Sequence, residues 1–269
     1  MVLGDRTLVM GVINTTPDSF SDGGRFGSAQ QAIEEGMRMA DEGADMIDVG
    51  GESTRPGSDP VSVEEELKRV LPVVQGLAAR VSIPISVDTM KARVALESLD
   101  AGAEIINDVS SFNYDPAMAK AIASAGAGVV LMHMRGMPKV MQQGDLSYPS
   151  LIEDITDYLQ EKIDKAVLEG IERSRIVVDP GIGFGKTPAD NMRLIRHLAR
   201  FNKLGRPILI GVSRKAFIGL ATGGGPSERI EGTAAAVTAS ILNGAHIVRV
   251  HDVSVMKKVV LMADAIKRA

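Results

Sequence analysis

The sequence predicts a (β/α)8 TIM barrel: one α/β domain over residues 1–269, with eight parallel strands and long loops on its C-terminal face. Three observations predict this fold. The chain has 269 residues, 45% of them hydrophobic, which suits a single closed barrel with a substantial core. Eight short runs rich in valine and isoleucine are apolar at both odd and even positions, which is typical of strands that are buried on both faces. Helical patterns separate these runs, so eight strand–helix units account for the length.

The predicted strands share one pattern, a short apolar run followed by a polar residue. In chain order they are Thr7–Ile13, Asp45–Val49, Pro84–Val87, Glu104–Ile106, Ala127–Met132, Arg175–Val178, Pro207–Val212 and Ala245–Val250. The segment Ser28–Glu42 illustrates the intervening helices, because its apolar residues recur at spacings of three and four.

Helix starts and ends are marked by capping signals. Ser28-x-x-Gln31 and Ser62-x-x-Glu65 match capping boxes, and Thr187-Pro188 and Asp115-Pro116 place a capping residue before a first-turn proline. Four Gly-Ala pairs suit left-handed helix ends that lead into a strand; their glycines are Gly43, Gly102, Gly126 and Gly244.

The Gly-Ala pairs also set a register. Asp48, Asn107 and Arg249 each lie five residues after such a glycine, so we expect them at one level near the C-terminal ends of their strands. The fourth unit departs from this spacing, because His133 lies seven residues after Gly126. Several segments after strands are long, and loops of this length in a barrel carry the active site; they are 14–27, 50–62, 134–149 and 213–227.

Composition narrows the class of partner. Lysine and arginine total 30 against 34 acidic residues, a formal net charge of −4, which argues against nucleic acid or an anionic membrane as a partner. The absence of cysteine excludes disulfides and thiol nucleophiles. No long apolar segment or signal pattern is present, so we expect a cytoplasmic protein.

Every predicted strand ends in a polar or charged residue, and these residues predict a ligand site because so many buried polar groups need partners. They are Asn14, Asp48, Asp88, Asn107, His133, Asp179, Lys215 and Arg249 with His251. Asp88, Asn107 and Asp179 suit a neutral heterocycle with amino and ring N–H groups, and Lys215 suits its carbonyl or ring nitrogen.

The remaining strand ends suit an anion and a cation. Arg249 and His251 form a pair of positive charges suited to a phosphate, in the region where barrels bind phosphate. Asn14, with Asp18 nearby, suits Mg²⁺, which is commonly held by few protein oxygens together with substrate phosphates. A cap or turn role remains the alternative for Asn14.

Aromatic residues are scarce, and most follow strands, which favours a flat ligand; half of them are equally explained as loop anchors. Phe184, within Gly181-Ile-Gly-Phe-Gly185, is the best candidate for packing against a ring, because its glycines permit close approach. The following Gly185-Lys-Thr187 is not a phosphate-binding P-loop, because Pro180 stands where that motif needs glycine.

These segments resemble the signature blocks of the dihydropteroate synthase family along nearly the whole chain. The matching segments are Met10–Gly24, Ile47–Gly57, Ser86–Thr89, Ile106–Val109, Asp179–Lys186, Ser213–Lys215 and Arg249–His251. The resemblance implies a Mg²⁺-dependent transferase of folate biosynthesis that joins 6-hydroxymethyl-7,8-dihydropterin diphosphate to para-aminobenzoate. It also implies a cytoplasmic homodimer and a sulfonamide target.

The resemblance implies three subsites. The pterin subsite comprises Asp88, Asn107, Asp179 and Lys215. The diphosphate subsite comprises Asn14, Arg249 and His251, with Asn14 also on the metal. The para-aminobenzoate subsite comprises Thr54, Arg55, Phe184 and Ser213, with Pro56 shaping the loop. Arg249, His251, Lys215 and Asp88 are the residues expected to take part in catalysis.

Two alternatives remain. A methyltransferase acting on methyltetrahydrofolate with a corrinoid partner shares the barrel, but should lack both the Ser-Thr-Arg-Pro-Gly loop and the Arg249–His251 pair. A pterin-binding barrel without catalytic activity is the second, and release of diphosphate would distinguish it. The dimer contact is expected at the last two helices, where the alanine-rich segment 232–242 could face either a partner or the barrel.

Overall fold

The computed structural model describes residues 4–15 and 24–269, without the side chains of residues 24–28 and 226. Eight strands alternate with helices, as predicted. The strands are β1 (Leu8–Asn14), β2 (Met46–Gly50), β3 (Ile85–Asp88), β4 (Ile105–Asp108), β5 (Gly128–Met132), β6 (Ile176–Asp179), β7 (Leu209–Ile210) and β8 (Ile247–Val250). The α-helices are α1 (Gly24–Asp41), α2 (Val63–Ala78), α3 (Ala92–Asp100), α4 (Met118–Ala125), α5 (Leu151–Leu168), α6 (Pro188–Arg196), α7 (Ala216–Thr222), α8 (Ile230–Leu242) and α9 (Val253–Arg268).

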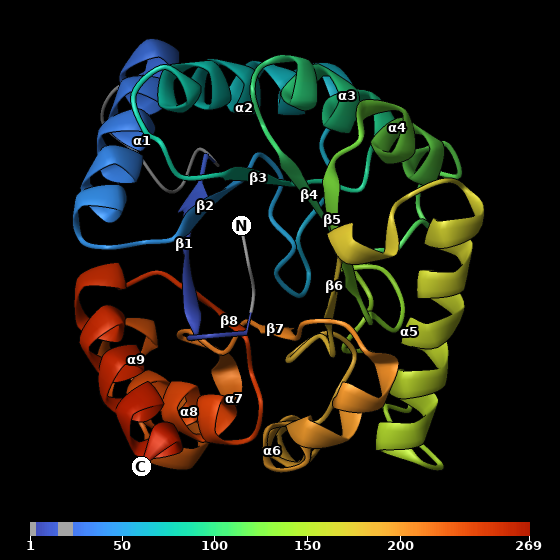
Figure 1. Ribbon diagram of the computed structural model, residues 1–269, viewed down its shortest axis with the longest axis vertical. Coiled ribbons are helices and arrows are strands. Elements are labelled where there is room, and N and C mark those ends of the chain that lie inside the picture. Colours follow the sequence, from blue (N-terminus) through green and yellow to red (C-terminus); the bar gives the residue numbers. More distant parts are fainter. Residues whose placement is uncertain (1–3, 16–23) are drawn as a thin grey trace.

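The strands form a barrel with the helices around it (Figure 1). All pairings are parallel, in the order β6-β5-β4-β3-β2-β1-β8-β7. A single parallel bridge between Val178 and Ile208, with a hydrogen bond of 3.0 Å from Val178 N to Pro207 O, joins β6 to the segment before β7. The predicted TIM barrel is therefore confirmed. Its weakest strand pairing is between β6 and the segment before β7, which share a single bridge.

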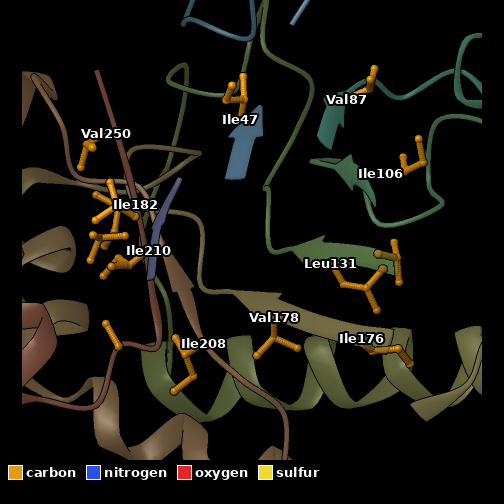
Figure 2. Packing of buried hydrophobic residues seen from close by; sticks show 14 of the residues in the cluster. Ile47, Val87, Ile106, Leu131, Ile176, Val178, Ile182, Ile208, Ile210 and Val250 are labelled. Carbon is orange, nitrogen blue, oxygen red and sulfur yellow. The ribbon is translucent and has the colours of Figure 1, made fainter. Parts of the chain in front are cut away.

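The two faces of each strand have different partners. Ile47, Val87, Leu131 and Val178 pack outward in the core shared with the helices, and Figure 2 shows Val178 directed from β6 toward α5. A separate apolar cluster, comprising Leu8, Met10, Met46, Val130, Leu209 and Ile247, fills the lower interior. Because side chains two residues apart share a face, the residues that follow this cluster on the strands point into the upper interior.

The expected capping signals are partly confirmed. Ser62 accepts a hydrogen bond from Glu65 N, Thr187 caps α6, and the four Gly-Ala glycines all have positive φ. The Ser28 box is wrong, because α1 begins four residues earlier, at Gly24. Asp115 is also not a helix cap: it accepts from Ala92 N and Ala117 N, and so joins the start of α3 to the turn before α4.

One unit departs from strict alternation. Two α-helices, α7 and α8, follow β7, and the described part of the chain therefore has one more helix between β7 and β8 than expected. Among the described residues, none of the helices is both apolar enough and long enough to span a bilayer.

A buried ion-pair triad anchors the loop after β2. Lys91, at the start of α3, pairs with Glu66 of α2 and lies 2.6 Å from Glu52 Oε2. The same Glu52 oxygen accepts a hydrogen bond from Val61 N, so Glu52 holds the far end of the loop as well. All three side chains are buried.

We expect Lys91→Met to reduce the free energy of unfolding by about 3–5 kcal/mol, because it leaves two buried carboxylates without their cation. Urea unfolding of the purified protein measures this change. Lys139→Met is the matched control, because Lys139 pairs with Asp59 on the surface and should matter by less than about 1 kcal/mol. Equal effects of the two substitutions would contradict the assigned role of the triad.

Candidate active site at the barrel mouth

Three residues from distant parts of the chain meet in the upper interior of the barrel. Asp48 Oδ2 accepts hydrogen bonds from Asn107 Nδ2 at 3.0 Å and from Arg249 Nε at 2.7 Å. Each of these three residues lies five positions after the glycine of a Gly-Ala pair. Their contact confirms that they lie at one level of the barrel. Each follows an apolar interior residue by two positions on its strand, the three being Met46, Ile105 and Ile247.

A second carboxylate holds the same guanidinium. Arg249 Nη2 lies 3.1 Å from Asp88 Oδ2, at the end of β3. Burial raises the pKa of Asp88, while Arg249 opposes that rise. Within the described chain no hydrogen-bond partner is found for Nη1 of Arg249, which leaves this nitrogen for a ligand. The strand ends thus place one oriented cation beside two carboxylates.

Asp179 and Lys215 lie near each other, and near Arg249, at the ends of β6 and β7. The positive charges of Lys215 and Arg249 both act to lower the pKa of Asp179. Asp179 Oδ1 accepts from Gly181 N at 2.6 Å. Gly181 has φ +72°, and a Cβ there would lie 1.9 Å from the carbonyl oxygen of His133, so only glycine fits this turn. Lys215 Nζ lies 4.2 Å from the ring centroid of Phe184, so the Phe184 ring lies beside this group of charges.

Burial shifts the pKa values of Asp179 and Lys215 in opposite directions. It raises the pKa of Asp179 to about 6, although the Gly181 N–H and Lys215 act against this rise. It lowers the pKa of Lys215 to about 8, and the charge of Arg249 lowers it further. Both groups are therefore charged mainly between pH 6 and pH 8 in the free protein.

We expect kcat/KM for the pterin substrate to fall below pH about 6, as Asp179 gains a proton, and above about 8, as Lys215 loses one. This ratio reports ionisation of the free enzyme, so a pH series of initial rates measures it. Asp179→Asn should remove the fall of kcat/KM at low pH. Lys215→Arg should move the fall at high pH to a higher pH. A profile that keeps both falls in these variants would rule the assignment out.

The predicted pair of positive charges after β8 needs correction. Burial, together with the nearby charges of Arg249 and Arg214, lowers the pKa of His251 to about 4, so its ring is neutral at neutral pH. Its Nδ1 lies 3.0 Å from Ser213 Oγ, and Arg55 also lowers its pKa, which places the β2 loop near this ring. Arg249 therefore supplies the charge, and His251 supplies a neutral hydrogen-bonding ring.

Thr54, Arg55 and Pro56 lie together in the loop after β2, with Arg55 and Pro56 exposed. Ser58 Oγ donates to the carbonyl oxygens of Ser53 and Arg55, the second at 2.8 Å, and this closes the loop on itself. Gly57 N bonds to Pro138 O at 3.0 Å, which joins the loop to the one after β5. The structure thus places the loop beside the mouth, with Arg55 and Ser213 both near His251.

Asn14 ends β1, and a Cβ built on Gly50 would lie 3.8 Å from Asn14 Oδ1 and 3.7 Å from Asp88 Cβ, so both side chains flank Gly50. No three His, Asp or Glu side chains group as a metal site within residues 4–15 and 24–269. The single amide oxygen of Asn14 nevertheless fits Mg²⁺ whose other ligands are water and substrate phosphate. Asp18, Phe20, Phe26 and most of the 14–27 loop lie outside the residues whose side chains the structure describes.

Most of the aromatic residues that the structure describes pack in the main core or against it. Phe112 and Phe217 belong to the main core, and Tyr114 is exposed. Phe184 alone of the described aromatics packs with a separate apolar cluster that includes Val109, Met90, Met132 and Met141. Met132 pairs in register with Asp179, so this cluster lies beside the polar groups at the strand ends. Methionine side chains adapt readily to a flat ring.

Two residues of the site were given no contact or role of their own from the sequence. The register had placed Asp48 at the right level, but its role as partner of Asn107 and Arg249 needed the structure. Lys186, set aside with the rejected P-loop, is buried and lies 2.9 Å from His133 Nδ1 and 3.0 Å from Phe184 O. It fixes the turn that carries Phe184, and a buried lysine directly after a glycine-rich turn was the available signal.

Fold and site together define a TIM barrel whose strands bring carboxylates, an amide, a lysine and an arginine together at its mouth. Residues 10–251 match the family described as pterin binding enzyme. A dihydropteroate synthase of Synechocystis is 45% identical over 266 residues, covering 98% of this chain and 92% of that protein.

Two solved structures agree with this match. The Yersinia pestis dihydropteroate synthase in a sulfonamide complex has a TM-score of 0.93 and 43% identity, covering 100% of this chain and 96% of that one. The Xanthomonas albilineans enzyme in complex with 7,8-dihydropteroate has a TM-score of 0.88 and 40% identity, covering 98% and 95%. The chain belongs to the pterin binding enzyme family and, within it, to the dihydropteroate synthases.

Proposed function

We propose that the barrel mouth binds 6-hydroxymethyl-7,8-dihydropterin diphosphate and para-aminobenzoate in adjacent subsites. The chain is a transferase of folate synthesis that condenses these two substrates to 7,8-dihydropteroate and releases diphosphate. The observation that carries the subsite proposal is that Asp48 bonds both Asn107 and Arg249, while Arg249 also bonds Asp88. This arrangement places acceptors for a heterocycle directly beside a cation for its leaving group.

The pterin ring is held by the acceptors and by Lys215. Asp179 and Asp88 accept from the amino and ring N–H groups, Asn107 supplies an amide, and Lys215 donates to the ring carbonyl or a ring nitrogen. The methionine-lined cluster beside Met132 and Phe184 supplies an apolar wall for the face of the ring. Buried carboxylates therefore define the pterin end of the pocket.

The diphosphate lies toward β8. Arg249 donates through Nη1, and His251 donates from its neutral ring. Asn14 would hold Mg²⁺ through its amide oxygen. When bound, Mg²⁺ supplies positive charge that stabilises the departing diphosphate. Dependence of the rate on added Mg²⁺, with loss of that dependence in Asn14→Ala, tests this assignment.

The reaction needs no side-chain nucleophile. The bond from the pterin methylene to the diphosphate oxygen breaks, and its electron pair leaves with the diphosphate. The electron-rich dihydropterin stabilises the resulting cation, and the carboxylates of Asp88 and Asp179 offset its charge. The aniline nitrogen of para-aminobenzoate then attacks the methylene and loses a proton.

The para-aminobenzoate subsite is formed by the loop after β2 and by the ends of β6 and β7. Arg55 is suited to the carboxylate, Thr54 and Ser213 to hydrogen bonds, and Phe184 to the ring, while Pro56 shapes the loop. Closure of the loops after β1 and β2 would exclude water, which could otherwise capture the cation. Sulfonamides resemble para-aminobenzoate in shape and charge, so we propose that they compete for this subsite.

The activity is tested by diphosphate release from the purified chain. We expect release that requires both para-aminobenzoate and Mg²⁺, with dihydropteroate formed in equal amount. Binding of a pterin without any diphosphate release would indicate a catalytically silent barrel. Methyl transfer from methyltetrahydrofolate to a corrinoid would indicate the alternative methyltransferase.

We propose a homodimer formed through α8 and α9. Leu242, Leu261, Met262 and Ile266 of these helices are large apolar side chains that are exposed in the single chain. Small residues of α8, including Thr233 and Ser240, face inward instead, so the alanine-rich segment serves the barrel as well. Sedimentation of the protein, compared with that of Leu261→Glu, distinguishes dimer from monomer.

We further propose that the enzyme works in the cytoplasm on small molecules alone. The formal net charge of −4 gives no general attraction to nucleic acid or to an anionic membrane. The substrate carries a diphosphate, which does not cross a bilayer unaided, so enzyme and substrate must share a compartment. Cell fractionation tests this placement.

A further inference from the structure

The carboxylate of Asp48 is the least exposed polar group of the site, and it contacts two groups with different tasks. Its side chain is fully buried, and a single oxygen, Oδ2, accepts from both Asn107 and Arg249. The other oxygen, Oδ1, is buried and finds no partner among the described residues. Asp48 therefore faces no solvent, and it lies against Asn107 and Arg249, two groups that the proposed function places on substrate.

The geometry at Arg249 gives this contact a specific consequence. Asp48 binds Nε, and Asp88 binds Nη2, so the plane of the guanidinium is held at two points. A planar guanidinium held in this way presents its remaining nitrogen, Nη1, in one direction. Loss of the Nε contact would leave one hydrogen bond, about which the group could rotate.

The same contact weakens the attraction of the free site for anions. Three described carboxylates, those of Asp48, Asp88 and Asp179, act on the guanidinium of Arg249. The other described cations around the mouth are Lys215 and Lys186 near Asp179, and Arg55 and Arg214 near His251. An isolated anion approaching Arg249 meets a cation that already has two anionic partners. The complete substrate also bonds through its pterin ring, and these additional contacts allow its diphosphate to bind at Arg249.

We infer that Asp48 is a positioning residue that orients Arg249 for the leaving diphosphate and lowers the affinity of the empty site for free diphosphate. This inference rests on the proposed role of Arg249 as the diphosphate-binding cation. It assigns Asp48 two effects of opposite sign. Orientation by Asp48 raises the turnover of complete substrate, whereas its charge disfavours an anion without a pterin.

Asp48→Asn tests both effects, because it keeps the size of the side chain and removes its charge. We expect kcat to fall about tenfold or more, as expected when a charge-assisted hydrogen bond is lost. We expect the Kd for inorganic diphosphate with Mg²⁺, measured by calorimetry, to fall several-fold. A general loss of structure would lower both kcat and the affinity for diphosphate. A lower kcat together with a higher affinity therefore separates positioning from a merely structural role.

Two further variants make the test decisive. Asp48→Glu keeps the charge and displaces it, so kcat should fall while the Kd for diphosphate stays near that of the wild type. Ser86→Ala is the matched control, because Ser86 is the buried neighbour of Asp48 in register on β3, and it should change neither property. If Asp48→Asn does not fold, Asp48→Glu still tests the orientation effect through kcat.

Separate outcomes overturn the inference and the function on which it rests. An unchanged kcat in Asp48→Asn, or an unchanged or raised Kd for diphosphate, would overturn the inference about Asp48. Arg249→Gln measured in the same way distinguishes the other failure: if that variant binds diphosphate as well as the wild type, the proposed role of Arg249 itself is wrong.

Discussion

Arg249→Ala is expected to lower kcat by about 10²–10³-fold, the usual loss when one preorganised group that stabilises developing charge is removed. Arg249 is the only described strand-end cation with two anchoring carboxylates, and the proposed function places the leaving diphosphate against its Nη1, for which the described residues provide no hydrogen-bond partner. The neutral ring of His251 does not replace that charge. The rate of diphosphate release at saturating substrate measures the effect.

Stability must be measured alongside, because Arg249→Ala leaves Asp48 and Asp88 buried without their shared cation. We expect a lower Tm but a folded protein, since both carboxylates can be relieved by taking up a proton. Arg249→Lys is the intermediate control, because it keeps the charge and loses the fork geometry. A folded Arg249→Ala protein with wild-type turnover would falsify the electrostatic role.

Asp179→Asn is expected to raise KM for the pterin substrate by roughly 10²-fold, the effect of losing about two charge-assisted hydrogen bonds. The amide retains one acceptor oxygen, which can still bind Gly181 N, but it directs an NH₂ group at the N–H donors of the ring. Initial rates at varied pterin diphosphate, with para-aminobenzoate saturating, measure KM.

Asp108→Asn is the matched control for this substitution. Asp108 is a buried aspartate at the end of β4, but its oxygens accept from Ser110 N at 2.9 Å and Phe112 N at 2.7 Å. We therefore expect Asp108→Asn to lower stability with little change in KM. If Asp179→Asn changed only stability and Asp108→Asn raised KM, the placement of the pterin ring would be wrong.

The local signals in the sequence predicted the barrel well, because its units repeat. Each Gly-Ala pair marks a helix end whose positive φ only glycine adopts at low cost, and in three of the four units the strand begins three residues after the glycine. That constancy is why Asp48, Asn107 and Arg249 could be placed at one level before any coordinates. Ser28 failed as a cap because an equivalent pattern inside a helix looks the same in sequence.

Properties that depend on burial and on distant partners were not predictable. His251 was expected to be positively charged, but its environment joins Ser213, Arg55 and Arg249, which lie far apart in sequence. The tasks of Asp48 and Lys186 likewise depend on contacts across 59 and 53 residues. Spacing shows that such groups share a face, whereas their charge and orientation follow only from the packed structure.

A crystal structure of the protein with the pterin diphosphate substrate tests the central claim most directly. The ring should lie within hydrogen-bond distance of Asp179 and Asn107, with the diphosphate against Arg249 Nη1 beside β8. A ring bound outside the barrel mouth, or a diphosphate directed away from β8, would contradict the account.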